Sequence, residues 1–155
     1  MKQTTLSTEP KEQDEIKWRL ELKTLIVVAG LMIEEGCVLV SQRKEGSPHG
    51  GLWEFPGGKV MEGEEPREAL RRELKEELDI EVEVGRIFDA VFEPHPEGPL
   101  LLLAFRCGKV KGHLKPLGCA DLRWVPLKEL EGLAMPPADE PIRKRLCSPE
   151  ESALL

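Results

Sequence analysis

The sequence predicts an α/β domain in which a mixed sheet is layered with helices. Apolar segments typical of strands lie before and after an amphipathic stretch at residues 66–78, whose apolar residues recur at helical spacing. A second helical segment follows at residues 141–147, near the C-terminus. Strands around one central helix, with a further helix at the end, favour a layered α/β arrangement.

A hairpin forms the first part of the predicted sheet. Residues 22–33 are rich in Val, Ile and Leu, as in a strand that is buried on both faces. Residues 34–36 are expected to turn, and residues 37–43 to form the returning strand. The glycine-rich residues 44–51 are expected to form a loop on the way to the central helix.

The central helix is expected over residues 66–78, because both of its ends carry sequence signals. Glu64 and Glu65 precede it and Pro66 stands in its first turn, where acidic residues and proline suit a helix N-terminus. Asp79 stands where the helix should end, and Asp tolerates the left-handed conformation of a C-cap better than most residues. The expected apolar face comprises Ala69, Leu70, Leu74 and Leu78.

The second half of the chain supplies the remaining elements. Residues 80–92 alternate between apolar and polar, which is the period of a strand, and residues 93–98 are expected to turn. Asp139 or Glu140 stands where either could cap the terminal helix. The other predicted elements are a strand at 99–107, a short strand at 122–126, a short helix at 127–133 and the terminal helix at 141–147.

The predicted domain occupies residues 21–150 of a chain of 155 residues, a length that fits one domain. Residues 1–20 are polar and charged, and we expect a flexible extension without the apolar core of a secretory signal. Residues 151–155 are expected to form a tail. The longest apolar runs, at residues 25–33 and 99–105, are too short to span a bilayer, so no membrane association is expected.

Charge and cysteine content narrow the functional classes. A formal net charge of −7 argues against a nucleic-acid polymer as partner, because such binders usually carry a basic surface. It does not argue against a small phosphate ligand, since a bound cation and a few local basic residues can carry that interaction. The four cysteines include no CxxC pair, and we expect reduced thiols in a cytoplasmic protein. The oligomeric state is left open.

Three glutamates of the central helix are the principal candidate site. Glu73, Glu76 and Glu77 lie at i, i+3 and i+4, so a helix places them on one face. Like charges at this spacing repel one another. A hard divalent cation such as Mg²⁺, or alternatively Mn²⁺, suits an all-oxygen cluster of this kind. The alternative is a solvated charged helix face, which the adjacent pair of glutamates alone would not exclude.

The wider pattern around these glutamates is far more specific. Gly58 is followed by five residues, Glu64, seven residues and the run Arg72-Glu73-Leu74-Lys75-Glu76-Glu77, and Ile80 closes the set. This pattern resembles the signature of the Nudix hydrolases, and the resemblance implies an α/β/α sandwich with a central mixed sheet.

The same resemblance implies roles for individual residues. Glu73, Glu76 and Glu77 would hold the metal, Arg72 would orient the catalytic glutamates, and Glu64 would support the loop before the helix. A backbone carbonyl of Gly57 could complete the metal shell, because glycine allows close approach. The expected catalytic and metal-binding residues are therefore Gly57, Glu64, Arg72, Glu73, Glu76 and Glu77.

Segments outside the signature look like the MutT branch of that family. They are residues 41–43, 51–60 and 135–141. Members of that branch hydrolyse nucleoside triphosphates to the monophosphate and pyrophosphate, and they include enzymes that remove oxidised purine nucleotides and a CTP pyrophosphohydrolase. The resemblance implies a similar Mg²⁺-dependent activity in sanitising the nucleotide pool. Arg43 and Lys59 are then candidate phosphate contacts, with a solvated charge as an equal alternative for each.

Two positions depart from the family pattern. The signature normally has a glycine where this chain has Asp79, which we interpret as a tolerated C-cap. The MutT branch often has a metal-binding glutamate six residues before the tryptophan that matches Trp124, and here that position is Gly118. Asp121 is the nearest carboxylate and the candidate replacement. If the loop carries no ligand, we expect Gly118→Glu to raise activity.

Asp139 is the candidate base-reading residue. The oxidised-guanine enzyme has an asparagine at this place in the MutT-like alignment, and an asparagine amide both donates and accepts. An ionised aspartate only accepts. It therefore matches the exocyclic amino group of cytosine or adenine, whereas 8-oxoguanine would require a protonated Asp139. The alternative role is that Asp139 only caps the terminal helix.

Two other functions are alternatives. One is the hydrolysis of another nucleoside diphosphate derivative, such as ADP-ribose or a dinucleoside polyphosphate. The other is nucleotide sensing without turnover, which the intact glutamates of the helix argue against and Gly118 favours weakly.

Overall fold

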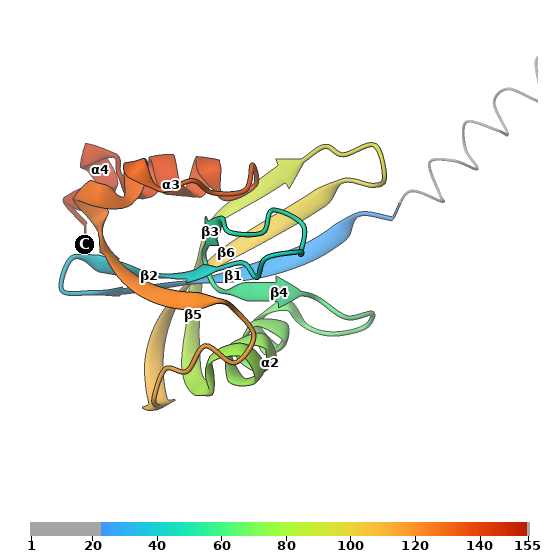
Figure 1. Ribbon diagram of the computed structural model, residues 1–155, viewed down its shortest axis with the longest axis horizontal. Coiled ribbons are helices and arrows are strands. Elements are labelled where there is room, and N and C mark those ends of the chain that lie inside the picture. The colour runs from blue at the N-terminus through green and yellow to red at the C-terminus, as the bar shows by residue number, and fades with distance from the viewer. Residues whose placement is uncertain (1–22, 155) are drawn as a thin grey trace, which may run out of the picture.

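A mixed, curved sheet forms the centre of the part of the chain that the computed structural model describes, residues 23–154 (Figure 1). The expected extension at residues 1–20 lies outside these residues, as does the start of the first predicted strand. The seven strands within the described part are β1 (Leu25–Glu34), β2 (Cys37–Gln42), β3 (Trp53–Glu54), β4 (Gly57–Lys59), β5 (Ile80–Glu93), β6 (Leu100–Gly112) and β7 (Asp121–Pro126).

The strand order combines parallel and antiparallel pairs, as expected. The main path is β3-β2-β1-β6-β5, with β4 paired to β1 and β7 paired to β2. β1 and β6 run parallel, from Leu25 opposite Leu100 to Met32 opposite Cys107. The other pairs are antiparallel. β3 lies at one end of this path, and β4, which contains Gly57 and Gly58, pairs with the central strand β1.

Helices cover both faces of the sheet. The helical elements are α2 (Pro66–Leu78), the 3-10 helix η1 (Leu127–Gly132), α3 (Glu140–Leu146) and α4 (Pro149–Ser152). Figure 1 shows α2 below the sheet and α3 and α4 above it. The expected α/β/α layering is therefore confirmed. None of the helices in residues 23–154 combines the length and the apolar composition needed to cross a bilayer.

Strand β1 supplies apolar side chains to two cores. Successive residues of a strand point to opposite faces of its sheet. Ala29 and Leu31 belong to the core that packs beneath α3, whereas Val28 and Met32 belong to the core that packs against α2. Burial on both faces explains why the run at residues 25–33 is apolar throughout rather than alternating.

Local signals set both ends of α2. At its start the Glu65 side chain accepts a hydrogen bond from the backbone N–H of Glu68, and Pro66 occupies the first turn. At its end Asp79 adopts the left-handed conformation, with φ of 56° and ψ of 38°, and its N–H donates to Lys75 O. The predicted bounds of the helix and the predicted C-cap at Asp79 are confirmed.

Other elements differ from the prediction. Strands β3 and β4 were not predicted, because two or three residues beside proline and glycine carry no strand period. β6 continues beyond residue 107, since pairing with β5 carries its more polar end up to Gly112. The tail expected at residues 151–155 is partly tied to the domain. Glu151, in α4, forms ion pairs with Arg106 and Arg145.

Candidate active site

The apolar face of α2 fixes the direction of its glutamates. Leu70, Leu74 and Leu78 are fully buried against the sheet, and full burial of a leucine stabilises a fold by roughly 1.5–3 kcal/mol. The helix therefore cannot rotate without exposing them. Arg72 and Glu73 then reach β4, and Glu77 reaches the loop at Gly118.

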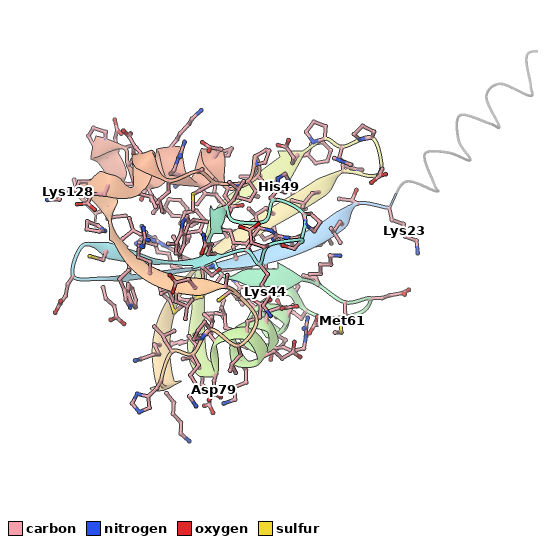
Figure 2. All side chains as sticks on the ribbon, in the orientation of Figure 1. Lys23, Lys44, His49, Met61, Asp79 and Lys128 are labelled. Atoms are coloured by element: carbon pink, nitrogen blue, oxygen red, sulfur yellow. The ribbon has the colours of Figure 1, made fainter. Side chains whose placement is uncertain are left out.

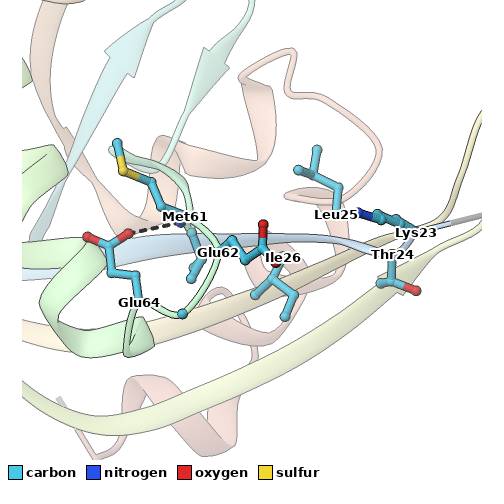
Figure 3. A pocket seen from close by; sticks show the side chains of 9 residues that line it. Lys23, Thr24, Leu25, Ile26, Met61, Glu62 and Glu64 are labelled. Atoms are coloured by element: carbon cyan, nitrogen blue, oxygen red, sulfur yellow. Dashed lines mark hydrogen bonds between the residues drawn. The ribbon is translucent and has the colours of Figure 1, made fainter.

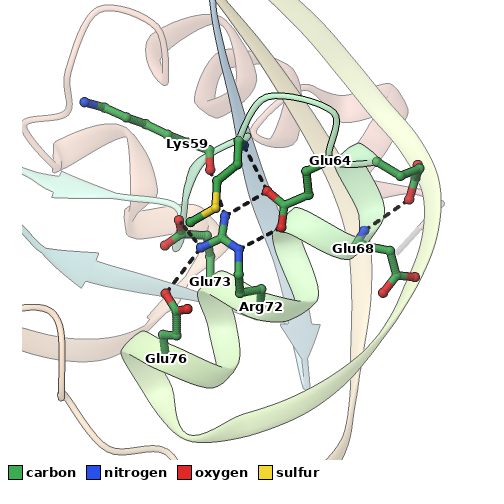
Figure 4. Close-up of polar contacts among 8 residues, drawn as sticks. Lys59, Glu64, Glu68, Arg72, Glu73 and Glu76 are labelled. Atoms are coloured by element: carbon green, nitrogen blue, oxygen red, sulfur yellow. Dashed lines mark hydrogen bonds and ion pairs between the residues drawn. The ribbon is translucent and has the colours of Figure 1, made fainter.

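The guanidinium of Arg72 contacts the carboxylates of three glutamates (Figure 4). Its Nε and Nη2 contact the two carboxylate oxygens of Glu64 at 2.7 and 3.0 Å, and its Nη1 contacts Glu73 at 2.9 Å and Glu76 at 3.3 Å. Nη2 also donates to Lys59 O at 3.0 Å. The paired contact with Arg72 lowers the pKa of Glu64 to about 2. Glu64 further accepts from the N–H of Met61, so it ties the loop before α2 to Arg72.

Glu73 lies directly on the backbone of β4. A Cβ built on Gly58 would stand 2.3–2.6 Å from the carboxylate atoms of Glu73, which no real side chain could tolerate. The Glu73 side chain is only 14% exposed. The glycine ahead of the signature helix is thus required by the close approach of this carboxylate.

Glu77 turns away from Arg72 into a separate pocket of about 170 Å³. Burial, followed by the charges of Glu73 and Glu54, raises the pKa of Glu77 to about 7. Lys44, on the loop after β2, also lines this pocket and lies near the middle of the molecule in Figure 2. The lining residues are Arg43, Lys44, Ser47, Glu54, Glu77, Gly118 and Cys119.

Glu54 is a site residue that the sequence prediction missed. It lies in β3 opposite Ser41 of β2, and its carboxylate pairs with Arg43 Nη1 at 2.8 Å. Burial raises the pKa of Glu54 although Arg43 opposes the shift. One signal could have found it, because Glu54 is a single carboxylate between Trp53 and Phe55, two aromatics that are both buried.

Asp139 is buried beside the same strand. The capping alternative is wrong, because in the described chain its side chain caps no N–H of α3. Its Oδ1 instead accepts from the N–H of Phe55 at 3.3 Å, and the residue is 7% exposed. Burial, and next the charge of Glu54, raise the pKa of Asp139 to about 7. Asp139 is therefore buried, Glu54 and Glu77 are partly buried, and the charge of Glu54 acts on both of the others.

The carboxylates of α2 suit a divalent cation, but they are divided between two groups. Within residues 23–154 no three His, Cys, Asp or Glu side chains are already arranged to hold a metal ion. The reason is that Glu73 and Glu76 turn to Arg72 whereas Glu77 turns to the pocket with Arg43. The residues fit a divalent cation by their chemistry, because the donors are all hard oxygens. Burial, followed by the charges of Glu73 and Glu54, raises the pKa of Glu77, so a bound cation would favour its ionised form.

The remaining predicted residues are less closely assembled. Gly57 lies in β4 opposite Ala29. The Lys59 side chain is exposed and extends away from Arg72 (Figure 4). Asp121 is exposed at the start of β7, opposite Gln42, and accepts from the N–H of Leu122. The loop before β7 reaches the pocket through Gly118 and Cys119, and Asp121 is not among its lining residues.

The geometry at Gly118 argues against the expected benefit of Gly118→Glu. A Cβ at Gly118 would stand 2.7 Å from Cγ of Glu77. A glutamate placed there would therefore displace Glu77 before it could add a ligand.

A larger hollow of about 600 Å³ lies on the other side of Glu64 (Figure 3). It is lined by residues 23–26 and 60–64. Leu25, Ile26 and Met61 are partly exposed there, while Glu64 directs its carboxylate to Arg72 and to the N–H of Met61. We place the chemistry in the smaller pocket, because that is where buried carboxyls and Arg43 meet.

Comparisons with known proteins find similar sequences and similar structures. The sequence pattern of the NUDIX domain matches residues 23–146. The chain is 37% identical over 122 residues to the CTP pyrophosphohydrolase of Escherichia coli, covering 78% of this chain and 90% of that protein. It is 40% identical over 115 residues to a putative 8-oxo-dGTP diphosphatase 2 of Mycobacterium tuberculosis, covering 74% and 82%. A crystal structure of a MutT protein from Methanosarcina mazei superposes with a TM-score of 0.72 at 29% identity, covering 81% and 94% of the two chains.

Proposed function

This chain belongs to the Nudix hydrolase family, and from that premise we propose that it is a Mg²⁺-dependent nucleoside triphosphate pyrophosphohydrolase. The reaction converts a nucleoside triphosphate and water to the nucleoside monophosphate and pyrophosphate, and its role is to sanitise the nucleotide pool. The observation that carries the proposal is the set of carboxylates on α2, with Glu73 on the backbone of β4 and Glu77 in the pocket beside Arg43.

The proposed metal site uses residues of α2 and β4. Glu73, Glu76 and Glu77, with the carbonyl of Gly57, would hold Mg²⁺, and Mn²⁺ could take its place. When bound, the divalent cation neutralises charge on phosphate oxygens and lowers the pKa of a water molecule. We assign no ligand role to Asp121, because it lies at an exposed position outside the pocket.

The chain's own cations orient the site and the substrate. Arg72 holds Glu73 and Glu76 by charge-assisted hydrogen bonds, so its loss would release both carboxylates. Arg43 lines the pocket with Glu77 and is the proposed phosphate contact. Lys59, which is exposed on β4, is proposed as a second phosphate contact.

Asp139 is the proposed base reader. Its burial beside Phe55 and Glu54 raises its pKa to about 7, so both the ionised and the protonated forms are populated near neutral pH. The ionised form accepts from the amino group of cytosine. The protonated form can donate to O6 of 8-oxoguanine. We therefore propose that cytidine nucleotides are turned over better than dGTP, and that 8-oxo-dGTP is also a substrate.

A panel of nucleotides tests the function. CTP, dCTP, dGTP, 8-oxo-dGTP and ADP-ribose would be incubated with the protein in Mg²⁺ and then in excess EDTA, and the products separated by anion-exchange chromatography. We expect monophosphate and pyrophosphate from CTP or 8-oxo-dGTP in Mg²⁺ and none in EDTA. Cleavage of ADP-ribose alone would replace the proposal with the diphosphate-derivative activity. Nucleotide binding without product would identify a sensor.

A further inference from the structure

The loop at residues 115–118 closes over the end of α2. The N–H groups of Leu117 and Gly118 both donate to Glu77 O, at 2.9 and 3.1 Å, and the N–H of Lys115 donates to Leu78 O at 3.0 Å. The last carbonyls of a helix have no partner within the helix. This loop therefore satisfies the carbonyl of the same residue whose side chain enters the pocket.

Gly118 also touches the Glu77 side chain. A Cβ at position 118 would stand 2.7 Å from Cγ, 3.0 Å from Cβ and 3.2 Å from Cα of Glu77. The backbone of the loop thus packs against the stem of this glutamate, whose side chain lines the pocket with Arg43 and Glu54. Any other residue at 118 would push Glu77 aside or lift the loop from the helix.

An ion pair ties the loop to the helix cap. Lys115 Nζ contacts Asp79 Oδ2 at 3.0 Å, and Lys75 Nζ contacts the other oxygen at 2.8 Å. Figure 2 shows Asp79 at the lower end of the molecule, where α2 ends. Asp79 and Gly118 thus lie on the two sides of the interface at which the loop docks on the end of α2.

We propose that residues 115–118 form a clamp that positions Glu77, and that Gly118 is the positioning residue that lets the clamp close. The clamp replaces a loop carboxylate with a rigid support, since it adds no ligand and instead fixes one that α2 supplies. This inference rests on the proposed function, because it assumes that Glu77 holds the metal.

Calorimetric titration of the nucleotide-free protein with Mn²⁺ tests the clamp. Gly118→Ala should bind Mn²⁺ about 10-fold more weakly, which is the size of effect seen when a residue that orients a metal ligand is lost. The Mg²⁺ concentration needed for half-maximal activity should rise in the same proportion. Gly132→Ala is the matched control, because a Cβ at Gly132 meets nothing within 4 Å. It should bind Mn²⁺ as the wild type does.

Thermal unfolding separates the clamp from a general packing defect. Gly118→Ala should lower Tm, and the loss should be smaller in a Glu77→Ala background, which lacks the clashing Cγ. Equal Tm losses in both backgrounds, or unchanged Mn²⁺ affinity in Gly118→Ala while Glu77→Ala binds more weakly, would overturn the clamp alone. If Glu77→Ala itself binds Mn²⁺ like the wild type, the metal role in the proposed function fails instead.

Lys115→Met tests the ion pair, because two explanations predict opposite changes in Mn²⁺ affinity. Removing a positive charge strengthens cation binding by electrostatics alone, whereas loosening the clamp weakens it. We expect Mn²⁺ affinity to fall about twofold, in keeping with the small worth of an exposed ion pair. A rise in affinity would show that the ion pair does not support the clamp.

Discussion

Two sets of carboxyls in this protein experience opposite environments. Glu64 and Asp79 flank α2 and are paired with cations: Arg72 lowers the pKa of Glu64 to about 2, and Lys75 and Lys115 lower that of Asp79 to about 2. Glu77 lines the pocket with Arg43, Asp139 is buried beside Phe55, and burial raises the pKa of each to about 7.

The difference between the two environments indicates where a bound ligand would be stabilised most. The carboxylates at the helix ends are already stabilised by the protein's own cations, so their role is to hold structure. Burial makes the ionisation of Glu77 and Asp139 unfavourable, so a divalent cation at Glu77 or a donor group at Asp139 would stabilise the ionised carboxylate. Strongly perturbed carboxyls of this kind cluster at functional sites.

Removal of the Glu77 carboxylate should have the largest effect. Glu77→Gln is expected to lower kcat by at least ~10²-fold, the scale of lost electrostatic stabilisation in metal-assisted hydrolysis. Tm should be unchanged or higher, because a buried charge among like charges is removed. Glu76→Gln should cost less, since Glu76 is 58% exposed. Steady-state kinetics and thermal unfolding check both, and near-normal turnover in Glu77→Gln would remove it from the mechanism.

Loss of the Arg72 guanidinium should have the next largest effect on activity. Arg72→Lys keeps the charge but cannot hold Glu64 by two bonds while also reaching Glu73 and Glu76. Activity should fall about 10- to 100-fold, as for other residues that orient metal ligands. Arg71→Lys is the matched control, because Arg71 pairs only with exposed Glu68 in the described chain. Equal kinetics in the two variants would show that Arg72 does not act through the glutamates.

Asp139→Asn should change the choice of base. An asparagine still accepts from the N–H of Phe55 and also donates. The ratio of kcat/KM should therefore shift toward 8-oxo-dGTP by ~1–3 kcal/mol, the worth of one good bidentate base contact. Competition between CTP and 8-oxo-dGTP measures this ratio. If the ratio stays constant while only stability changes, another residue reads the base.

The pH dependence of stability should separate the two sets of carboxyls. For Glu77 and Asp139, stabilisation is fully present below their ordinary pKa values of 4.5 and 3.8 and is lost as the pH rises through about 7. For Glu64 and Asp79 the sign is opposite, so their contribution is lost only as the pH falls through about 2.

Urea unfolding of the metal-free protein at pH 5 to 8 measures this contrast. The double variant Glu77→Gln, Asp139→Asn should gain stability relative to the wild type as the pH rises from 5 to 7. A difference between the two proteins that stays constant across this range would contradict the assigned pKa values.

Features set by neighbours in sequence were predictable, and features set by distant contacts were not. The bounds of α2 and the left-handed cap at Asp79 follow from residues within a few positions of each end. Glu54 enters the site only because β2 pairs with β3, and Asp139 reaches Phe55 across 84 positions of the chain. The clash between a side chain at 118 and Glu77 depends on how the loop docks on α2, which no local pattern encodes.

Binding of Mn²⁺ to the nucleotide-free protein, followed by electron paramagnetic resonance, tests most directly whether the buried carboxylate holds the cation. Glu68, on the exposed side of the first turn of α2, supplies the comparison. We predict that Glu77→Gln weakens Mn²⁺ binding by about 10-fold or more, whereas Glu68→Gln leaves it at the wild-type value. Equal affinities in Glu77→Gln, Glu68→Gln and the wild type would contradict the assignment of Glu77 as a metal ligand.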